Sequence, residues 1–236
     1  MPSRQSCGTL KLMTSKNSNG ESIRVLTVSD VVVDRFYTAR IRSLLDDVDL
    51  IISCGDLPYY YLEFMVDMLD VPMFFVHGNH DPEVEISSRG DRHYPWGAVN
   101  LHQNFVMHKG LILFGLEGSA RYSKSLHQFT QREMWWEVIR AVPRLLYNKI
   151  RYGRALDLFI THSPAWQLGD AEDRAHTGFK AFRWLLEKFK PKYHIHGHVH
   201  IYDRKESVPI KYQETMIVNT YSYQKLTIEL PEGKNG

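Results

Sequence analysis

The feature that most constrains this chain is a short apolar run that breaks off into a polar turn. Residues 74–76 (Phe-Phe-Val) lead directly into residues 77–81 (His-Gly-Asn-His-Asp). An apolar run that ends near a glycine is typical of a buried strand that stops at a tight turn. In open α/β sheets, ligands collect where the carboxyl ends of the strands leave the sheet. Asn79 and His80 would offer an amide oxygen and an imidazole there, although the turn alone fits a solvated loop equally well.

The rest of the sequence alternates short apolar runs with amphipathic stretches. Strands are expected at 23–29, 50–54, 105–107, 111–116, 156–160 and 193–196, and helices at 36–48, 59–70, after Thr130 and around 179–189. This alternation predicts βαβ units and a mainly parallel sheet. Two closing strands, at 215–219 and 225–230, suit an antiparallel edge.

Three further features describe how these elements are bounded. Thr130 and Glu133 have the spacing of a capping box at the start of a helix. Pro143 is expected to end or kink that helix, because proline lacks the N–H that a helix interior needs. The long irregular stretch 82–104 is expected to form the rim of a site, since loops of this length usually serve one.

Composition narrows the protein class. At 236 residues the chain fits one domain, for which we expect the bounds 22–232 after a flexible arm at 1–21. The net charge of +2 argues against nucleic acid or an anionic membrane as a partner. No apolar run approaches the length of a membrane span. Two cysteines, Cys7 and Cys54, make no disulfide framework, so a reducing, cytoplasmic setting is expected.

Side chains that can bind metal follow five of the expected strands. They are Asp30, Asp56, Asn79, His80, His162, His198 and His200. Carboxylate, amide and imidazole groups without thiolate are the ligands of borderline to hard divalent metals such as manganese, iron or zinc. A single such residue is usually an ordinary core or surface residue, but five strand ends that each present one are hard to explain as solvated turns. The sequence therefore predicts a metal site at the strand ends.

The order of these motifs resembles the calcineurin-like metallophosphoesterase superfamily. The resemblance rests on Asp30, the Gly-Asp pair at 55–56, the Gly-Asn-His-Asp motif at 78–81, the Thr-His pair at 161–162 and the Gly-His-Val-His motif at 197–200. It implies a four-layer α/β/β/α sandwich with two mixed β-sheets. It also implies a centre of two divalent metal ions, Mn²⁺ or Fe and Zn, at the strand ends.

The resemblance further implies a role for each of these residues. One metal would be held by Asn79, His162 and His198, and Asp56 would bridge it to the second. Asp30 and His200 would complete the second metal's ligands. His80 would face the substrate phosphoryl group, and Asp81 would orient it.

One position departs from the family pattern. The family has histidine two residues after its first aspartate, and this chain has Val32 there. One interpretation is that the Asp30 site is weakened or lost, which would leave a binding module with impaired catalysis. The other is that Asp30, Asp56 and His200 still suffice together with water, as three protein ligands do at many catalytic zinc centres.

If both metals bind, the resemblance implies a metal-dependent phosphoric ester hydrolase. Two cations activate a hydroxide for attack on phosphorus and neutralise charge on the phosphoryl oxygens. Phosphodiesters or small, nucleotide-like phosphates are the expected substrates. Arg121 and Tyr122 follow a glycine turn where they could contact a phosphate, and His176 precedes a helix where it could line the substrate mouth. For each of these three, an ordinary surface or capping role is the alternative.

Overall fold

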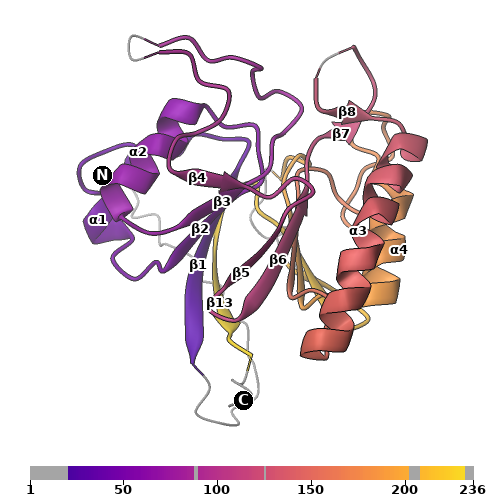
Figure 1. Ribbon diagram of the computed structural model, residues 1–236. Coiled ribbons are helices and arrows are strands. Elements are labelled where there is room, and N and C mark those ends of the chain that lie inside the picture. The colour runs from indigo at the N-terminus through magenta and orange to yellow at the C-terminus, as the bar shows by residue number, and fades with distance from the viewer. Residues whose placement is uncertain (1–20, 88–89, 125, 202–207, 232–236) are drawn as a thin grey trace.

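The computed structural model describes residues 21–87, 90–124, 126–201 and 208–231. These residues form four layers in the order α/β/β/α, with two mixed sheets between two pairs of helices (Figure 1). The fold expected from the family resemblance is therefore confirmed. Most of the expected N-terminal arm lies outside the described residues, and the expected bounds of the domain stay a prediction. Within the described part of the chain, no helix has the length and apolar character to cross a bilayer.

The first sheet has five strands in the order β13-β1-β2-β3-β4. Their bounds are Ser22–Ser29 (β1), Leu50–Ser53 (β2), Met73–Phe75 (β3), Ala98–Asn100 (β4) and Ser222–Glu229 (β13). β1 to β4 run parallel to one another, and β13 pairs antiparallel with β1 along its whole length.

The second sheet has six strands in the order β11-β12-β10-β9-β6-β5. Their bounds are Phe105–His108 (β5), Leu111–Leu116 (β6), Leu158–Thr161 (β9), Tyr193–His196 (β10), Ile210–Tyr212 (β11) and Thr215–Asn219 (β12). The four inner strands are parallel, and β5 and β11 are antiparallel edges. A small separate ladder joins β7 (Ser119–Ala120) to β8 (Gln128–Phe129).

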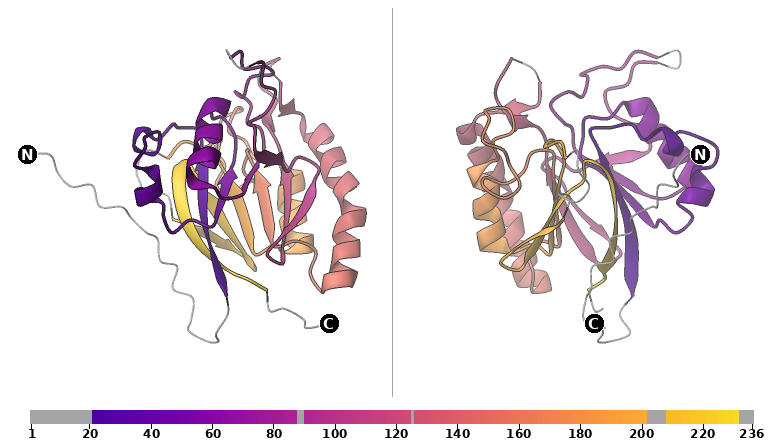
Figure 2. Two further views of the ribbon diagram at one scale, coloured as in Figure 1. Left: turned by 60° about the vertical axis from the view of Figure 1, so that its left-hand side comes forward. Right: turned by 180° about the vertical axis from the view of Figure 1, so that it is seen from behind.

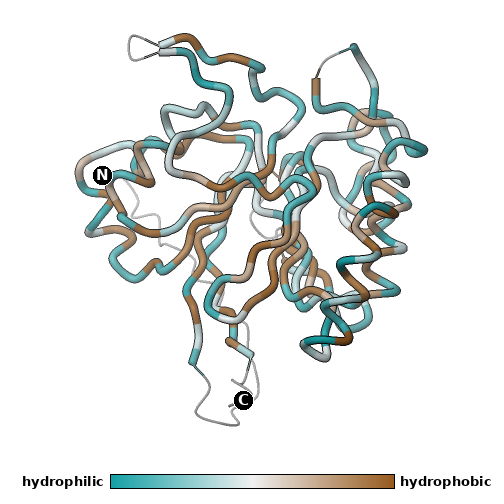
Figure 3. The backbone as a smooth tube through the Cα atoms, in the orientation of Figure 1, coloured by the Kyte–Doolittle hydropathy of each residue, from teal (hydrophilic) through white to brown (hydrophobic). Residues whose placement is uncertain are grey.

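The side chains of each strand alternate between the two faces of its sheet, and this produces three apolar layers, one between the sheets and one on the outer face of each sheet. Successive side chains of a strand point to opposite faces, so Val25 packs between the sheets while Leu26 packs outward against helices. Likewise, Leu113 faces the first sheet and Phe114 faces the outer helices. Both faces of the central strands are covered, which is why Figure 3 shows them as nearly continuous hydrophobic runs.

Helices cover the outer face of each sheet. The first sheet carries the 3₁₀ turn η1 (Asp34–Phe36), α1 (Ile41–Leu44) and α2 (Tyr59–Leu69). The second carries α3 (Gln131–Tyr152) and α4 (Lys180–Phe189), which lie side by side in both views of Figure 2. The capping box expected at the start of α3 is present, because Thr130 and Glu133 exchange hydrogen bonds through their side chains and backbones.

The expected helix at 36–48 is wrong, because the chain forms only η1 and the four-residue α1 there. The Thr38 hydroxyl donates to the Arg35 carbonyl at 3.0 Å, and such local bonds compete with helix formation. Asp46 and Asp47 would also place negative charge at the helix C-terminus, where the macrodipole disfavours it. Asp47 pairs instead with Lys225 of β13 at 2.9 Å.

Two other expectations need correction. Pro143 does not end its helix, and α3 continues to Tyr152. Pro143 lies on an exposed face, so water can satisfy the carbonyl of Ile139 that the proline leaves without a donor. The closing strands do not share one antiparallel edge. β12 runs parallel to β10 inside the second sheet, and of the two closing strands only β13 is an antiparallel edge strand. β11 takes the edge position beside β12.

Candidate metal centre

The candidate ligands lie where five parallel strands end. They are Asp30, Asp56 and Asn79 after β1, β2 and β3 of the first sheet, and His162, His198 and His200 after β9 and β10 of the second. Because parallel strands bring their carboxyl ends to one edge, each sheet delivers its residues to the same side. The structure therefore brings together both halves of the predicted set at the seam between the sheets.

The backbone turns sharply at three of these residues. Asp30, Asp56 and His198 have φ values of 63°, 57° and 67°, in the left-handed region. Aspartate and histidine enter this region more readily than most side chains, although at some cost. Backbone strain of this kind is typical of functional sites, where the surrounding structure holds it in place.

Two glycines make room for the carboxylates. A Cβ atom on Gly78 would lie 2.0 Å from Oδ1 of Asp56, and one on Gly197 would lie 2.7 Å from Oδ2 of Asp30. Neither position can carry a side chain while the carboxylates stay in place. The absence of a side chain at Gly78 and Gly197 thus leaves space for the carboxylates of Asp56 and Asp30.

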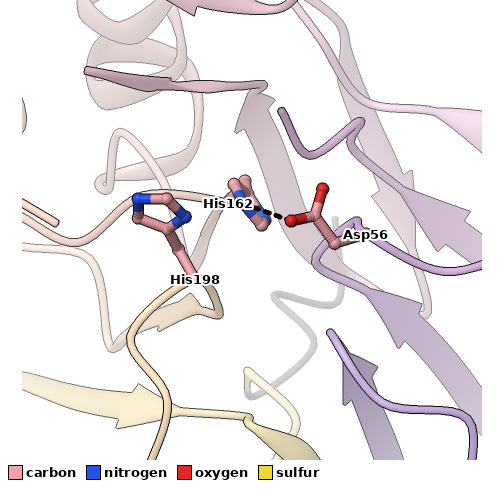
Figure 4. A group of neighbouring side chains, drawn as sticks. All are labelled: Asp56, His162 and His198. Atoms are coloured by element: carbon pink, nitrogen blue, oxygen red, sulfur yellow. Dashed lines mark ion pairs between the residues drawn. The ribbon is translucent and has the colours of Figure 1, made fainter. Parts of the chain in front are cut away.

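His162 lies at the middle of the first ligand set. Its Nε2 atom is 3.4 Å from Oδ2 of Asp56 and 3.0 Å from Oδ1 of Asn79. The other ring nitrogen, Nδ1, donates to the Cys54 carbonyl at 2.7 Å, which fixes the orientation of the ring. Figure 4 shows His162 between Asp56 and His198, and one ligand atom from each of these three lies within 4.8 Å of the others.

The second ligand set is looser. The Asp30 carboxylate accepts the backbone N–H of His198 at 3.1 and 3.2 Å and lies 3.9 Å from Nε2 of His200. The Asp30 side chain is 1% exposed, whereas that of His200 is 44% exposed. Val32 packs against the outer core under α1 and α2. The position where the family has a ligand thus contributes to packing in this chain.

Comparison with known proteins agrees with this geometry. The family model of calcineurin-like phosphoesterases matches residues 23–202, which include every candidate ligand. The chain belongs to this family. Its members bind divalent metals, and the oxygen and nitrogen donors described above fit such ions.

Solved structures of this family's fold are similar over nearly the whole chain. The protein TT1561 of Thermus thermophilus is 12% identical with a TM-score of 0.56, and the alignment covers 89% of this chain and 100% of that one. Vacuolar Protein Sorting 29 from Cryptosporidium parvum is 11% identical with a TM-score of 0.43, over 90% and 94% of the two chains. The similarity to TT1561 shows that the two chains share a fold. Comparison with curated sequences gave no match.

The electrostatics are those of a site prepared for a cation. Burial alone would raise the pKa of Asp56, but the adjacent His162 ring lowers it to about 2. Burial would lower the pKa of His162, but Asp56 raises it to about 9, so a proton lies between these groups when no metal is bound. Burial lowers the pKa of His198 to about 3, which keeps this ring neutral. His198 donates its Nε2–H to the Ala175 carbonyl at 2.8 Å, which leaves Nδ1 as a free ligand atom.

His80 lies at the exposed mouth of the centre. Its backbone N–H donates to Oδ1 of Asp56 at 2.7 Å, and its ring Nε2 is 3.4 Å from the Tyr122 hydroxyl. Tyr122 also accepts a hydrogen bond from the Asn79 amide at 3.0 Å. Tyr122 therefore joins the exposed His80 ring to the candidate ligand Asn79. This link has no signal in the sequence, because 42 residues separate Tyr122 from His80.

The carboxylate of Asp81 has hydrogen bonds to the backbone. It accepts the N–H groups of Leu57 at 3.1 Å and Gly78 at 2.8 Å. Burial, and next the charge of Asp56, raise the pKa of Asp81 to about 6. Among the contacts of the described residues, none joins Asp81 to the His80 ring, and Tyr122 takes that place. Asp81 instead shapes the turn that presents both Asn79 and His80.

The two other expected substrate contacts lie in different surroundings. Arg121 pairs with Glu133 at 2.8 Å and donates to the Gln128 carbonyl, so its guanidinium is engaged at the start of α3. The ring of His176 lies 5.0 Å from that of His198, and its Nδ1 is 2.8 Å from Asp173. His176 thus lies at the border of the candidate centre, whereas Arg121 pairs with Glu133, a residue of the capping box of α3.

Proposed function

We propose that this chain hydrolyses phosphoesters at the centre formed by Asp56, Asn79, His162 and His198, with a second ion held by Asp30, Asp56 and His200. Phosphodiesters and small, nucleotide-like phosphates are the proposed substrates. The observation that carries the proposal is the exposed ring of His80, anchored through its backbone to the partly buried candidate ligand Asp56. A largely buried set of candidate ligands with an exposed imidazole beside it suits a reaction on a substrate that approaches from solvent.

The chain's own groups have distinct tasks in this reaction. When bound, the two ions activate water and neutralise charge on the phosphoryl oxygens. His80 donates a hydrogen bond to the phosphoryl group or a proton to the departing oxygen. The Tyr122 hydroxyl contacts both the His80 ring and the Asn79 amide and so fixes their positions relative to each other. The Cys54 carbonyl keeps His162 turned toward Asp56.

The test is hydrolysis of bis-p-nitrophenyl phosphate, a diester, and p-nitrophenyl phosphate, a monoester, with Mn²⁺, Fe²⁺ or Zn²⁺. We expect cleavage that a chelator abolishes and that added metal restores, with the diester preferred. A protein that binds metal at Asp56 and His162 but cleaves neither ester with any of the three ions would contradict the proposal.

A second candidate function rests on Val32. Valine has no atom that can bind a metal, so the Asp30 site lacks a ligand that the family provides, and this side chain packs against the outer core instead. A chain that binds one metal ion tightly but hydrolyses no phosphoester would act as a binding module of the same fold. Metal binding without hydrolysis is the result that favours this alternative.

The setting of the reaction is also a proposal. The buried thiol of Cys54 is free among the described residues, which suits a reducing, cytoplasmic environment. The near-neutral charge gives no support for a nucleic-acid partner.

A further inference from the structure

A second group of metal-binding side chains lies beside the candidate centre and shares no residue with it. The group consists of His77, two residues after the end of β3, Glu117 directly after β6 and His127 directly before β8. One ligand atom from each lies within 4.8 Å of the other two. None of the three belongs to the family motifs described above.

Glu117 lies between the two imidazoles. Its Oε2 atom is 3.0 Å from Nδ1 of His77, and its Oε1 atom is 3.2 Å from Nδ1 of His127. Burial would raise the pKa of Glu117, but hydrogen bonds from both rings hold it well below its usual range. The carboxylate is therefore charged, and a nitrogen of each ring faces it.

Backbone hydrogen bonds tie the three segments together independently of these side chains. The Gly118 N–H donates to the His77 carbonyl at 2.9 Å, and the Ser119 N–H donates to the His127 carbonyl at 3.0 Å. A Cβ atom at position 118 would lie 2.1 Å from the His127 carbonyl oxygen, so only glycine allows this approach. The ligand group thus has a scaffold that does not depend on its own ion pairs.

The group is both enclosed and accessible. The side chains of His77, Glu117 and His127 are 9%, 12% and 19% exposed. Glu117 and His127 line an open cavity of about 500 Å³, together with Glu137 on α3. His102 flanks the group, with Nε2 at 3.8 Å from Glu117 and 4.0 Å from Glu137. An ion can enter from this cavity and keep one coordination position open toward it.

We propose that His77, Glu117 and His127 form a site for one divalent transition metal, which is separate from the candidate centre. Two imidazoles and a carboxylate, with no thiolate, suit zinc, which takes three protein ligands and a water at open sites. The ion would take the place between the ring nitrogens and the carboxylate that the hydrogen bonds to Glu117 now occupy. The His102 ring, with Nε2 3.8 Å from Glu117, is close enough to the group to contact such a water.

Binding requires one ring to move. The rings of His77 and His127 are stacked with their centroids 4.6 Å apart and their planes at 12°. A metal lies close to the plane of an imidazole that binds it, so two nearly parallel rings cannot both ligate one ion well. His127 is the more exposed ring, and its rotation out of the stack would complete the site.

The experiment compares zinc uptake by the full-length wild type, Glu117→Gln and Glu133→Gln. Glu133 lines the same cavity but is no ligand, and glutamine preserves its capping box. Zinc is titrated by calorimetry, and bound zinc is counted by elemental analysis. We expect Glu117→Gln to lose one equivalent, or to bind it at least about tenfold more weakly, while Glu133→Gln matches the wild type.

A second readout locates the ion. Crystals soaked in zinc should give an anomalous peak between His77, Glu117 and His127, with the two rings no longer parallel. If Glu117→Gln does not fold, His127→Asn replaces it, since asparagine tolerates the left-handed backbone at this position (φ 52°). Equal zinc counts and affinities in wild type and variant would overturn the proposal. So would the absence of the peak in soaked crystals, or an extra equivalent bound only at millimolar zinc.

Discussion

At the scale of single residues, His80 is the group whose proposed role is in the reaction and not in metal binding. It is exposed, and among the contacts of the described residues it reaches the candidate ligands through its backbone N–H and through Tyr122. Its side chain can therefore be removed without removing a donor from the metal.

We expect His80→Ala to keep the metal content of the wild type but to hydrolyse a phosphodiester roughly 10²- to 10⁴-fold more slowly, which is the usual cost of losing a positioned acid. The measurement is turnover of bis-p-nitrophenyl phosphate at saturating Mn²⁺, with bound metal counted in parallel. His93→Ala is a control, because this exposed histidine lies on the irregular segment after the turn, where its ring contacts the Glu83 carbonyl. Equal turnover by His80→Ala and wild type would remove the role that we assign to His80.

A second prediction at the residue scale concerns Val32 and the proposed second ion. With Asp30, Asp56 and His200 alone, the second site should bind Mn²⁺ more weakly than the site at His162. Val32→His should tighten the second site and raise activity at low metal. Calorimetric titration with Mn²⁺ and parallel assays give the measurement, and Val31→His is the matched control one residue away. Two equally tight sites in the wild type would contradict this expectation, as would a folded Val32→His protein without any gain in affinity.

The candidate ligands could be picked out in the sequence because each lies within four residues of the end of a strand. The sequence was less informative about the residues around them. Arg121 was a candidate for contact with phosphate, but in the structure its guanidinium forms an ion pair with Glu133 at the start of α3. Glu117 follows a strand as the ligands do, yet its partners His77 and His127 come from distant segments. Contacts of this kind depend on tertiary packing, which leaves no local pattern.

At the scale of elements, the start of α3 shows a local signal that tertiary structure left intact. Thr130 accepts the Glu133 N–H at 3.2 Å, and Glu133 accepts the Thr130 N–H at 2.7 Å. Both residues are close in sequence, so the capping box could be predicted. The helix expected at 36–48 is the opposite case, in which a distant contact overrides the local pattern. Asp47 lies outside any helix and pairs with Lys225, which is 178 residues away in the sequence.

We expect Thr130→Ala to lower the free energy of unfolding by about 0.5–2 kcal/mol, because it leaves an N–H of the first turn without its acceptor. Urea denaturation followed by circular dichroism measures the change. Thr130→Ser retains the hydroxyl and should stay close to the wild type. An alanine variant as stable as the serine variant would show that the cap contributes nothing.

At the scale of the whole molecule, the interior holds a neutral histidine. His194 in β10 is fully buried, stacks on Phe159 and lies 2.9 Å from the Thr161 hydroxyl. Burial lowers its pKa well below the usual value, so the folded protein resists protonation there. The unfolded chain takes up that proton as pH falls below about 6.5.

It follows that His194 makes the metal-free protein less stable as pH falls below about 6.5, by up to about 1.4 kcal/mol for each pH unit. His194→Gln keeps a hydrogen-bonding group but cannot titrate, so its stability should depend less on pH between 6.5 and 5. Urea denaturation of both proteins in the presence of a chelator provides the comparison. Parallel pH profiles for the two proteins would exclude His194 as the source.

The four layers also have a consequence for how the chain is made. β13 pairs with β1 from Ser22–Glu229 to Ser29–Ser222, so the first strand needs a partner that is synthesised about 200 residues later. At roughly 5–20 residues per second, a ribosome takes about 10 to 40 s to produce it. Throughout that interval the edge of β1 has no native partner, and an open strand edge invites pairing with other chains. The first sheet therefore cannot be completed before β13 has been synthesised, and until then the exposed edge of β1 is a site where the nascent chain can aggregate.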